Sequence, residues 1–282
     1  MEICGYTQRM RHLVPLVFVA AAVVGVTGVT DASAQQGGQK AWLGVGIQNV
    51  ANGVLVSEVI DGAPADDAGL KQGDVITKVD NVAVRTTNAL VNQIARRRVG
   101  SAVQLTIVRA GRTTSVRAML DRRLNREELL NRRLLAKLAP DFNLNVMTRA
   151  GVKGKVRLSS LRGKVVVLEF WSRYCGYCKL VHPALSKLQR KHKQNLVVLG
   201  LADDPAAALR AHLAKPANAK GINFTTLHDS GSAIKRVYHV QSTPTIIVID
   251  NKGVVRFVGL GAGRNAGNAI NMAEHCVKNP HP

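Results

Sequence analysis

The feature that most constrains the fold is a pair of cysteines, Cys175 and Cys178, placed between two segments of different pattern. The residues before them, Val165 to Trp171, form an apolar run with the length and β-branched composition of a buried strand. After them, apolar residues recur at helical spacing from about Tyr177 to Lys193. The first N–H groups of a helix are unpaired and favour an anion, so a thiolate at this turn is stabilised, and Lys179 adds positive charge. The second sulfur lies on the first helical turn and can reach the first to close a disulfide.

The rest of the C-terminal half alternates between strand and helix patterns, which is typical of an α/β layered domain. The further expected elements are, in chain order, a strand at Leu196 to Leu201, helices near Ala206 to Leu213 and Ser232 to Tyr238, strands at Thr245 to Asp250 and Val254 to Gly259, and a helix at Asn265 to Val277. The turn residues Asn251 to Gly253 predict that the last two strands form a hairpin.

Residues 140 to 260 resemble the thioredoxin fold, and within it the secreted TlpA-like branch. The matching stretches are APDFNL at 139 to 144, LSSLRGKVVVLEFWSRYCGYCKLVHP at 158 to 183 and YHVQSTPTIIVIDNKGVV at 238 to 255. The resemblance implies that Cys175 is the nucleophile that attacks a substrate disulfide. It implies that Cys178 is the resolving thiol that then displaces the mixed disulfide.

The same resemblance implies roles for residues outside the cysteine pair. Pro244, after Thr243, matches the family's cis-proline beside the thiols, which leaves the backbone near Thr243 open for a substrate chain. Pro183 matches the proline that kinks the active-site helix. Glu169 matches a carboxylate beneath the second cysteine, where a buried acid with a raised pKa assists proton transfer. The alternative is a strand-end glutamate that reaches solvent, because periodicity alone does not fix the exposed face of this strand.

Two departures from the thioredoxin pattern concern the residues around the thiols. Gly176-Tyr177 stands where thioredoxins carry Gly-Pro, and Tyr174 replaces the usual tryptophan. The resulting CGYC resembles the active site of periplasmic disulfide isomerases of the DsbC type. The intervening residues affect the reduction potential, which spans roughly −270 to −120 mV across the family. The direction of electron flow therefore stays open.

Other uses of the two thiols are disfavoured. A structural disulfide across two residues closes too short a loop to restrict the unfolded chain much. A zinc site needs about four ligands, and the sequence has no second CxxC. We expect His182 to lie on the helix surface, and Cys276 to be a small buried apolar residue rather than a third catalytic thiol. The sequence thus predicts no metal site and no cofactor beyond the Cys175–Cys178 disulfide itself.

The region from residue 41 to 121 has a different pattern, with short strands separated by turn signals such as Asn52-Gly53 and Ala110-Gly111. Between the strands, Thr87 to Arg98 carries apolar residues at helical spacing. A shorter helix is expected near Pro64 to Gly69. These patterns predict a small β-rich domain with one clear helix.

Gly53 to Val84, GVLVSEVIDGAPADDAGLKQGDVITKVDNVAV, resembles the PDZ domains of extracytoplasmic HtrA-type bacterial proteases, and the similarity extends over about eighty residues. The resemblance implies that a glycine-containing loop binds a peptide's C-terminal carboxylate and that the next strand, Ile47 to Val50, accepts the peptide as an added strand. The implied peptide-binding residues are Leu43, Gly44, Val45, Gly46, Ile47, Leu90 and Ile94. The alternative is that the apolar members are simply core and that the groove is closed. No protease nucleophile loop is present, so the domain is expected to bind and not to cut.

Between the two domains, residues 122 to 139 are rich in leucine and arginine and favour a helix that ends before Pro140. Glu128 and Arg132 stand at a favourable i, i+4 spacing. Such a helix is expected to dock on a neighbouring domain, with self-association or membrane-surface binding as weaker alternatives.

The N-terminus has the pattern of a secretory signal peptide at residues 1 to 34. Basic residues precede an apolar run, and Ala32-Ser33-Ala34 supplies a small-residue cleavage site. A membrane anchor is the alternative, since the run has about the minimum length that spans a bilayer. We therefore expect an exported protein, in the bacterial periplasm, where disulfides persist.

The formal net charge of +21 lies mostly in residues 141–282, which hold 21 basic and 7 acidic side chains. A positive field of this kind attracts acidic proteins or anionic surfaces. With aromatic residues at 4% and no nucleic-acid motif, nucleic acid is not expected as a partner.

Together these patterns predict a multi-domain chain: a signal peptide at 1–34, a PDZ-like domain at 35–121, a basic linker helix at 122–139 and an α/β thioredoxin-like domain at 140–282. The expected function is an extracytoplasmic thiol–disulfide oxidoreductase, acting as reductase or isomerase, whose PDZ-like domain recruits partner or substrate peptides. The expected partners are a protein or peptide with disulfides or thiols, a C-terminal peptide and a redox partner. The alternative is a PDZ-based adaptor in which the thioredoxin-like domain is a redox-idle docking module.

Overall fold

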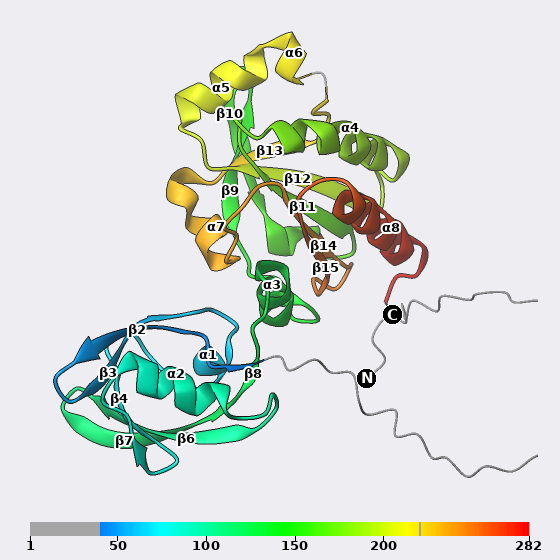
Figure 1. Cartoon of the computed structure of the whole chain (residues 1–282). Coiled ribbons are helices and arrows are strands. Elements are labelled where there is room, and N and C mark those ends of the chain that lie inside the picture. Colours follow the sequence, from blue (N-terminus) through cyan, green and yellow to red (C-terminus); the bar gives the residue numbers. More distant parts are fainter. Residues whose placement is uncertain (1–39, 220, 282) are drawn as a thin grey trace, which may run out of the picture. The chain divides into compact units, whose positions relative to one another are not determined.

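The computed structural model describes residues 40–219 and 221–281 (Figure 1). The predicted signal peptide, residues 1–34, lies outside the described residues. Within the described ranges, no helix combines the length and the apolar character needed to cross a membrane.

The first domain is built on an antiparallel sheet in the order β2-β3-β4-β6-β7, with the short β5 paired to β4. Its elements are β1 (Ala41–Trp42), β2 (Val45–Val50), β3 (Gly53–Val59), α1 (Pro64–Asp67), β4 (Val75–Val79), β5 (Val82–Ala83), α2 (Thr87–Ala95), β6 (Ala102–Arg109), β7 (Arg112–Met119) and β8 (Asp121–Arg122). The β6–β7 hairpin turns at Ala110 and Gly111, whose φ angles of 49° and 75° suit a tight two-residue turn. The predicted β-rich architecture with one longer helix is confirmed.

The core of this domain follows from strand alternation and from the apolar stripe of α2. Inward-facing side chains of β3, β4 and β6, such as Val54, Ile76 and Leu105, are fully buried. Leu90 and Ile94 of α2 are packed into the same core. Thr86 caps α2 by accepting a hydrogen bond from the backbone N–H of Ala89 at 3.2 Å.

A buried carboxylate stands at the start of β4, on Asp74, which is 1% exposed. Arg109 donates to both of its oxygens, from Nε at 2.7 Å and from Nη2 at 2.8 Å. The backbone N–H of Lys71 donates a third hydrogen bond at 2.8 Å. Burial raises the pKa of Asp74, but the bond from Arg109 and the one from Lys71 outweigh it and hold the pKa below its usual value. This carboxylate is therefore satisfied as an anion.

The connecting segment contains α3 (Arg126–Leu134), which is shorter than the sequence predicts. Asn125 and Glu128 form a reciprocal capping box at its start. The helix ends early because the chain then turns to bond strand β15: Ala136 has a φ of 61°, and its N–H donates to the carbonyl of Val255 at 2.9 Å.

Glu128 and Arg132 stand at i, i+4 spacing on α3, but each pairs with another residue. Glu128 accepts from Arg122 and from the backbone of Asn125, while Arg132 pairs with Asp121 at 2.5 Å. The capping box explains this choice, because it turns Glu128 back toward the start of the helix.

The second domain is a seven-stranded sheet in the order β10-β9-β13-β12-β11-β14-β15. Its elements are β9 (Asn143–Thr148), β10 (Gly151–Arg157), η1 (Leu158–Leu161), β11 (Val165–Trp171), α4 (Gly176–Lys191), β12 (Leu196–Ala202), α5 (Ala206–Ala214), α6 (Pro216–Ala219), β13 (Thr225–His228), η2 (Ser230–Ser232), α7 (Ala233–Val237), β14 (Thr245–Ile249), β15 (Val255–Leu260) and α8 (Arg264–Lys278). The central strand β11 is parallel to β12 and antiparallel to β14. The α/β layered domain is confirmed, and the sequence did not predict the β9–β10 hairpin at its edge.

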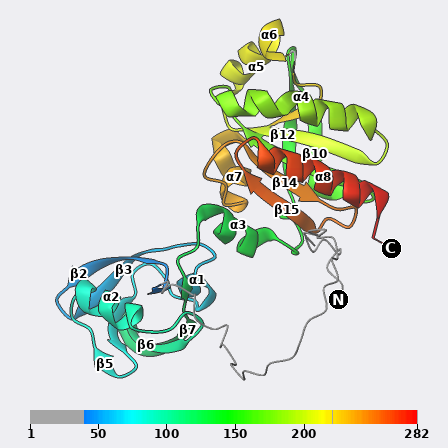
Figure 2. The ribbon, with the colours of Figure 1, turned by 45° about the vertical axis from the view of Figure 1, so that its right-hand side comes forward.

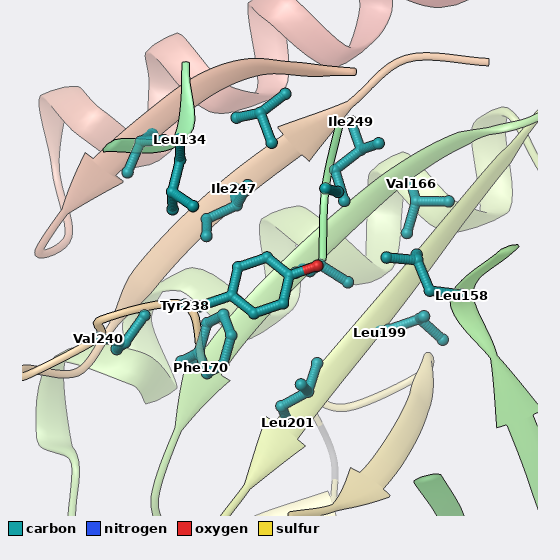
Figure 3. Close-up of a cluster of buried hydrophobic side chains, with 14 of the residues drawn as sticks. Leu134, Leu158, Val166, Phe170, Leu199, Leu201, Tyr238, Val240, Ile247 and Ile249 are labelled. Carbon is teal, nitrogen blue, oxygen red and sulfur yellow. The ribbon is translucent and has the colours of Figure 1, made fainter. Parts of the chain in front are cut away.

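Alternation along β11 divides the core into two layers. Val166, Leu168 and Phe170 face a cluster centred on Tyr238, whose ring centroid lies 5.5 Å from that of Phe170 (Figure 3). The α3 residues Leu130 and Leu134 pack into this same cluster, so the connecting helix is docked on the second domain.

The opposite face of β11 carries Val165 and Val167, which pack against α4 and α8 (Figure 2). Glu169 and Trp171 have the same parity in the strand and so point toward the same face. The strand alternation thereby places a glutamate between the sheet and the helix that follows the cysteines.

Candidate functional site

The two cysteines lie at the start of α4, and they form a disulfide with an S–S length of 2.03 Å. Cys175 is the N-cap residue, and its sulfur accepts a hydrogen bond from the backbone N–H of Cys178 at 3.1 Å. Cys178 is fully buried, whereas Cys175 is 9% exposed. Of the two residues, Cys175 alone keeps some exposed surface, and the helix N–H group that faces its sulfur can stabilise a thiolate there.

Positive charge surrounds this turn. Arg173 precedes the pair and is held by Asp204, which accepts a hydrogen bond from its backbone N–H at 2.9 Å and forms an ion pair with its guanidinium Nε at 3.3 Å. Lys179 follows the pair on the exposed side of α4. Burial lowers the pKa of the nearby His212, and Lys179 and Arg173 lower it further. The field around Cys175 thus favours its anionic form.

Three large side chains around the disulfide are exposed: Tyr174 by 77%, Tyr177 by 69% and Leu180 by 70%. The guanidinium carbon of Arg173 lies 4.1 Å from the centroid of the Tyr174 ring, which holds that ring by a cation–π contact. Exposed aromatic and aliphatic groups beside a reactive sulfur form a surface suited to a polypeptide substrate. Both tyrosines stand out in the sequence as departures from the thioredoxin pattern, but their exposure together with Leu180 is visible only in the structure.

The Thr243–Pro244 peptide bond is cis. Thr245, the next residue, begins β14 and pairs with Phe170 of β11. Because the two strands are antiparallel, the start of β14 and the end of β11 lie at the same edge of the sheet. The structure therefore brings Thr243 and Pro244 to the edge from which the chain leads on to the cysteines.

Glu169 is fully buried in the middle of the sheet, between Gly200 and Ile246 on the neighbouring strands. The solvent-facing alternative does not hold. Burial raises the pKa of Glu169, and His182 opposes part of that shift. A carboxyl group with a raised pKa takes up and releases a proton at a higher pH than an exposed one.

The expectation that His182 lies on the helix surface is wrong. It is 3% exposed, and its Nε2 atom lies 3.1 Å from Oε1 of Glu169. The signal was present in the sequence: His182 follows Cys178 by four residues, and i, i+4 residues share one helix face. Cys276, by contrast, is a residue of α8 that is buried in the core, as expected.

In the first domain, the glycine-containing segment Leu43–Gly46 leads into β2. Gly44 has a φ of 84°, and a Cβ built on it would lie 2.2 Å from the Cβ of Ala63, so this position requires glycine. The backbone carbonyls of Leu43 and Gly44 accept from Ala65 and Ile60 at 2.8 and 3.0 Å, which fixes the loop.

Strand β2 is at one end of the sheet order, beside α2. Asn49 of β2 accepts a hydrogen bond from the backbone N–H of Thr87 at 2.7 Å, which joins the strand to the start of that helix. Val45, Gly46 and Ile47 are partly exposed, whereas Leu90 and Ile94 lie in the core. The structure thus brings the predicted peptide-binding residues together beside an edge strand.

Two family models match the chain, one in each domain. Residues 41–120 match the model of the PDZ domain, and residues 135–258 match that of the AhpC/TSA family.

Similar curated proteins also divide by domain. The second domain is similar to the thioredoxin-like protein YneN of Bacillus subtilis, with 32% identity over 44% of this chain and 69% of that protein. It is similar to the thiol–disulfide oxidoreductase ResA of Oceanobacillus iheyensis, with 27% identity over 44% of this chain and 64% of that protein. The first domain is similar to a probable periplasmic serine endoprotease, DegP-like, of Rhizobium meliloti, with 36% identity over 27% of this chain and 18% of that protein.

Among solved structures, the thioredoxin domain of a thiol–disulfide oxidoreductase from Bacteroides vulgatus aligns with a TM-score of 0.42 at 20% identity, over 49% of this chain and 96% of that one. The HtrA-type protease AlgW with a decapeptide aligns with a TM-score of 0.29 at 26% identity, over 30% of each chain.

Proposed function

The chain belongs to the thioredoxin-like family of thiol–disulfide oxidoreductases, and on that premise we propose that it exchanges disulfides with exported proteins through Cys175 and Cys178. The observation that carries the proposal is the unequal burial of the two cysteine residues at a helix start, with 9% of Cys175 and none of Cys178 exposed. A redox pair needs one accessible cysteine, which attacks the substrate, and one shielded cysteine, which resolves the mixed disulfide. A structural disulfide does not need this difference in exposure.

The first step starts from the reduced pair. The Cys175 thiolate attacks one sulfur of a substrate disulfide, a Cys175–substrate bond forms, and the other substrate sulfur leaves as a thiolate. The helix N–H groups and the positive charge of Lys179 stabilise the attacking thiolate. Tyr174, Tyr177 and Leu180 supply the apolar surface on which the substrate chain rests.

In the second step, Cys178 loses its proton and attacks the Cys175 sulfur. The Cys175–Cys178 bond forms, the mixed disulfide breaks, and the second substrate sulfur leaves as a thiolate. The substrate is reduced by two electrons and the protein is oxidised. The reverse sequence oxidises a substrate, and the reduction potential of the pair decides which direction prevails.

The first domain recruits the partner in this proposal. β2 is an edge strand, so a substrate tail can add to the sheet and hydrogen-bond to it, and the loop at Gly44 receives the terminal carboxylate. Tethering the tail raises the local concentration of substrate at the second domain, so weak binding is sufficient. The apolar N-terminal run and the oxidisable thiols support export of the chain to the periplasm.

Reduction of insulin disulfides by the full chain, with dithiothreitol as electron source, tests the exchange chemistry. Cys175→Ser should abolish the reaction, and Cys178→Ala should leave a mixed disulfide that is visible on a non-reducing gel. Cys276→Ala serves as the matched cysteine control and should retain activity. Full activity of Cys175→Ser would end the proposal.

Removal of residues 40–121 separates recruitment from chemistry. Insulin reduction should persist in the shortened chain, whereas exchange with a peptide-tagged substrate captured by the first domain should slow. If neither the full chain nor the shortened chain reduces insulin but the full chain still binds the tag, the adaptor function replaces the one proposed.

A further inference from the structure

A buried acid–imidazole pair joins β11 to α4, the strand and the helix on either side of the cysteine turn. Nε2 of His182 and Oε1 of Glu169 are 3.1 Å apart, and the two side chains are 4% and 0% exposed. Among the residues that the structure describes, no other group hydrogen-bonds to either oxygen of Glu169 or to Nε2 of His182. Each is therefore the other's nearest partner, and a proton placed between them is shielded from solvent.

We infer that His182 is a positioning residue for the resolving step: it shares a proton with Glu169 and so sets the pH range in which Glu169 accepts the proton of Cys178. The inference rests on the proposed thiol–disulfide exchange and adds His182 to it, as a residue that acts through Glu169. It concerns only the second chemical step, because Cys178 is fully buried whereas Cys175 keeps 9% of its surface exposed.

Helix geometry connects the three groups. His182 is one turn after Cys178 on α4, and i, i+4 side chains lie on one helix face. That face packs against the odd-numbered residues of β11, among which is Glu169. Because Cys178 is fully buried, its proton has to pass to a protein group or an internal water when the thiol becomes a nucleophile.

The ring of His182 is held by aromatic contacts. The centroids of Trp171 and Phe224 lie 5.2 and 5.6 Å from its own, both edge-on. Gly221 also packs close, since a Cβ built on it would lie 3.4 Å from the Cβ of His182. These contacts keep Nε2 directed at the carboxylate in a site of low polarity, where the electrostatic influence of one group on the other is strong.

Other titratable and charged groups also act on this region. His212 of α5, whose ring centroid is 5.8 Å from that of Trp171, interacts electrostatically with His182 and with the buried Asp204. Arg173 and Lys179 add positive charge at the active-site turn. Burial raises the pKa of Glu169, and His182 lowers it. Removal of the imidazole should therefore raise the pKa of Glu169 further.

The proton balance of the resolving step is then complete. The Cys178 S–H bond breaks and its proton passes to the Glu169–His182 pair. The sulfur electron pair forms the bond to Cys175, and the substrate thiolate leaves with the electrons of the broken mixed disulfide. Reduction of the Cys175–Cys178 disulfide returns the proton.

A two-burst experiment with the full chain separates the two steps. Reduced protein is mixed with excess 5,5′-dithiobis(2-nitrobenzoate) in a stopped-flow instrument over a range of pH. Attack by Cys175 releases the first coloured thionitrobenzoate, and attack by Cys178 on the resulting mixed disulfide releases the second. Absence of the first burst would overturn the proposed function, whereas the second burst alone reports on His182.

His182→Phe keeps a buried ring and removes the shared proton. The first burst should be unchanged. The pH midpoint of the second burst should move upward, and below the wild-type midpoint its rate should fall by about tenfold for each unit of that shift. In a Glu169→Gln background, His182→Phe should cause no further shift, because its effect passes through the carboxylate.

His182→Gln serves as a second variant in case the phenylalanine variant does not fold. His192→Gln at the end of the same helix, where His192 faces Glu274 at 3.6 Å, is the matched control and should leave both bursts unchanged. An unchanged midpoint in a folded His182 variant, or an equal shift with and without Glu169, would overturn the inference and leave His182 with a packing role alone.

Discussion

Each domain buries a carboxylate against its sheet, Asp74 in the first and Glu169 in the second. The two carboxylates differ in their hydrogen-bond partners and in the direction of their pKa shifts. Asp74 accepts bidentate hydrogen bonds from the guanidinium of Arg109 and a third from a backbone N–H, and its pKa lies below the usual value. Glu169 has an imidazole at 3.1 Å and no well-aligned hydrogen bond among the described residues, and its pKa is raised. A buried acid with a full set of donors stabilises the structure as an anion, whereas a buried acid that lacks donors holds its proton more tightly.

The largest expected effect comes from removing the donor of the satisfied acid. Arg109→Ala leaves the buried carboxylate of Asp74 without its counter-charge and two of its hydrogen bonds, and an unsatisfied buried charged group costs ~3 kcal/mol or more. Hydrogen–deuterium exchange should show faster exchange throughout β4 and β6, with the second domain unchanged. Arg112→Ala, an exposed arginine in the same hairpin, is the control. Equal protection in both variants would show that Asp74 does not depend on this pair.

A smaller loss is expected at the peptide-binding loop. Gly44→Ala forces a left-handed backbone on a residue with a side chain and a clash at 2.2 Å with Ala63, which together cost ~2 kcal/mol or more. Binding of a fluorescent peptide with a free C-terminus should be lost, and insulin reduction should be retained. Gly69→Ala has a similar φ of 75° but no neighbour within 4 Å of the added Cβ, so it isolates the backbone strain from the clash. Undiminished binding by Gly44→Ala would place the peptide elsewhere.

The two acids should also give opposite pH dependence. For Asp74 the folded pKa is depressed, so its contribution to stability is present above the unfolded pKa and is lost as pH falls through the folded value. For Glu169 the folded pKa is raised, so the folded state holds the proton longer and stability falls as pH rises from the unfolded pKa to the folded one.

Glu169→Gln tests the second of these signs. At pH values above the folded pKa of Glu169, the substitution should stabilise the second domain by ~1.4 kcal/mol per unit of pKa shift removed. It should also slow the resolving step. Asp74→Asn should instead destabilise the first domain at neutral pH. Exchange protection of each domain, followed over a pH series from acid to mildly alkaline, measures both effects. A loss of stability in Glu169→Gln at high pH would contradict the expected sign.

The smallest expected effect concerns the field at the disulfide. Lys179→Gln removes one exposed charge near Cys175, and a charge at about 4 Å in water is worth ~1 kcal/mol or less. The pH of half-maximal alkylation of reduced Cys175 by iodoacetamide should rise by about half a unit, without change in stability. Lys187→Gln, further along α4, should leave alkylation unchanged, and an equal rise in both variants would point to net charge rather than proximity.

The sequence by itself determined both domain types and placed the cysteine pair between a strand and a helix. These follow from local pattern: a buried strand length, a helix period and turn residues at Asn52-Gly53 or Ala110-Gly111 are properties of neighbouring residues. The PDZ-like and thioredoxin-like resemblances rest on the same local strings, and the family models match the same two regions.

The tertiary structure determined which residue each buried polar side chain contacts. Apart from Glu169, both faces of the strand VVVLEFW are apolar, so the sequence does not show which face of the sheet buries the acid. The packing of α4 against the odd-numbered residues of this strand shows that Glu169 faces the helix and that His182 is its partner. The pairing of Asp74 with Arg109 joins residues 35 positions apart, and α3 stops early because the residues after it bond to β15. Local periodicity records which residues favour burial, but which buried groups face one another depends on long-range strand pairing and helix packing, which no short stretch of sequence contains.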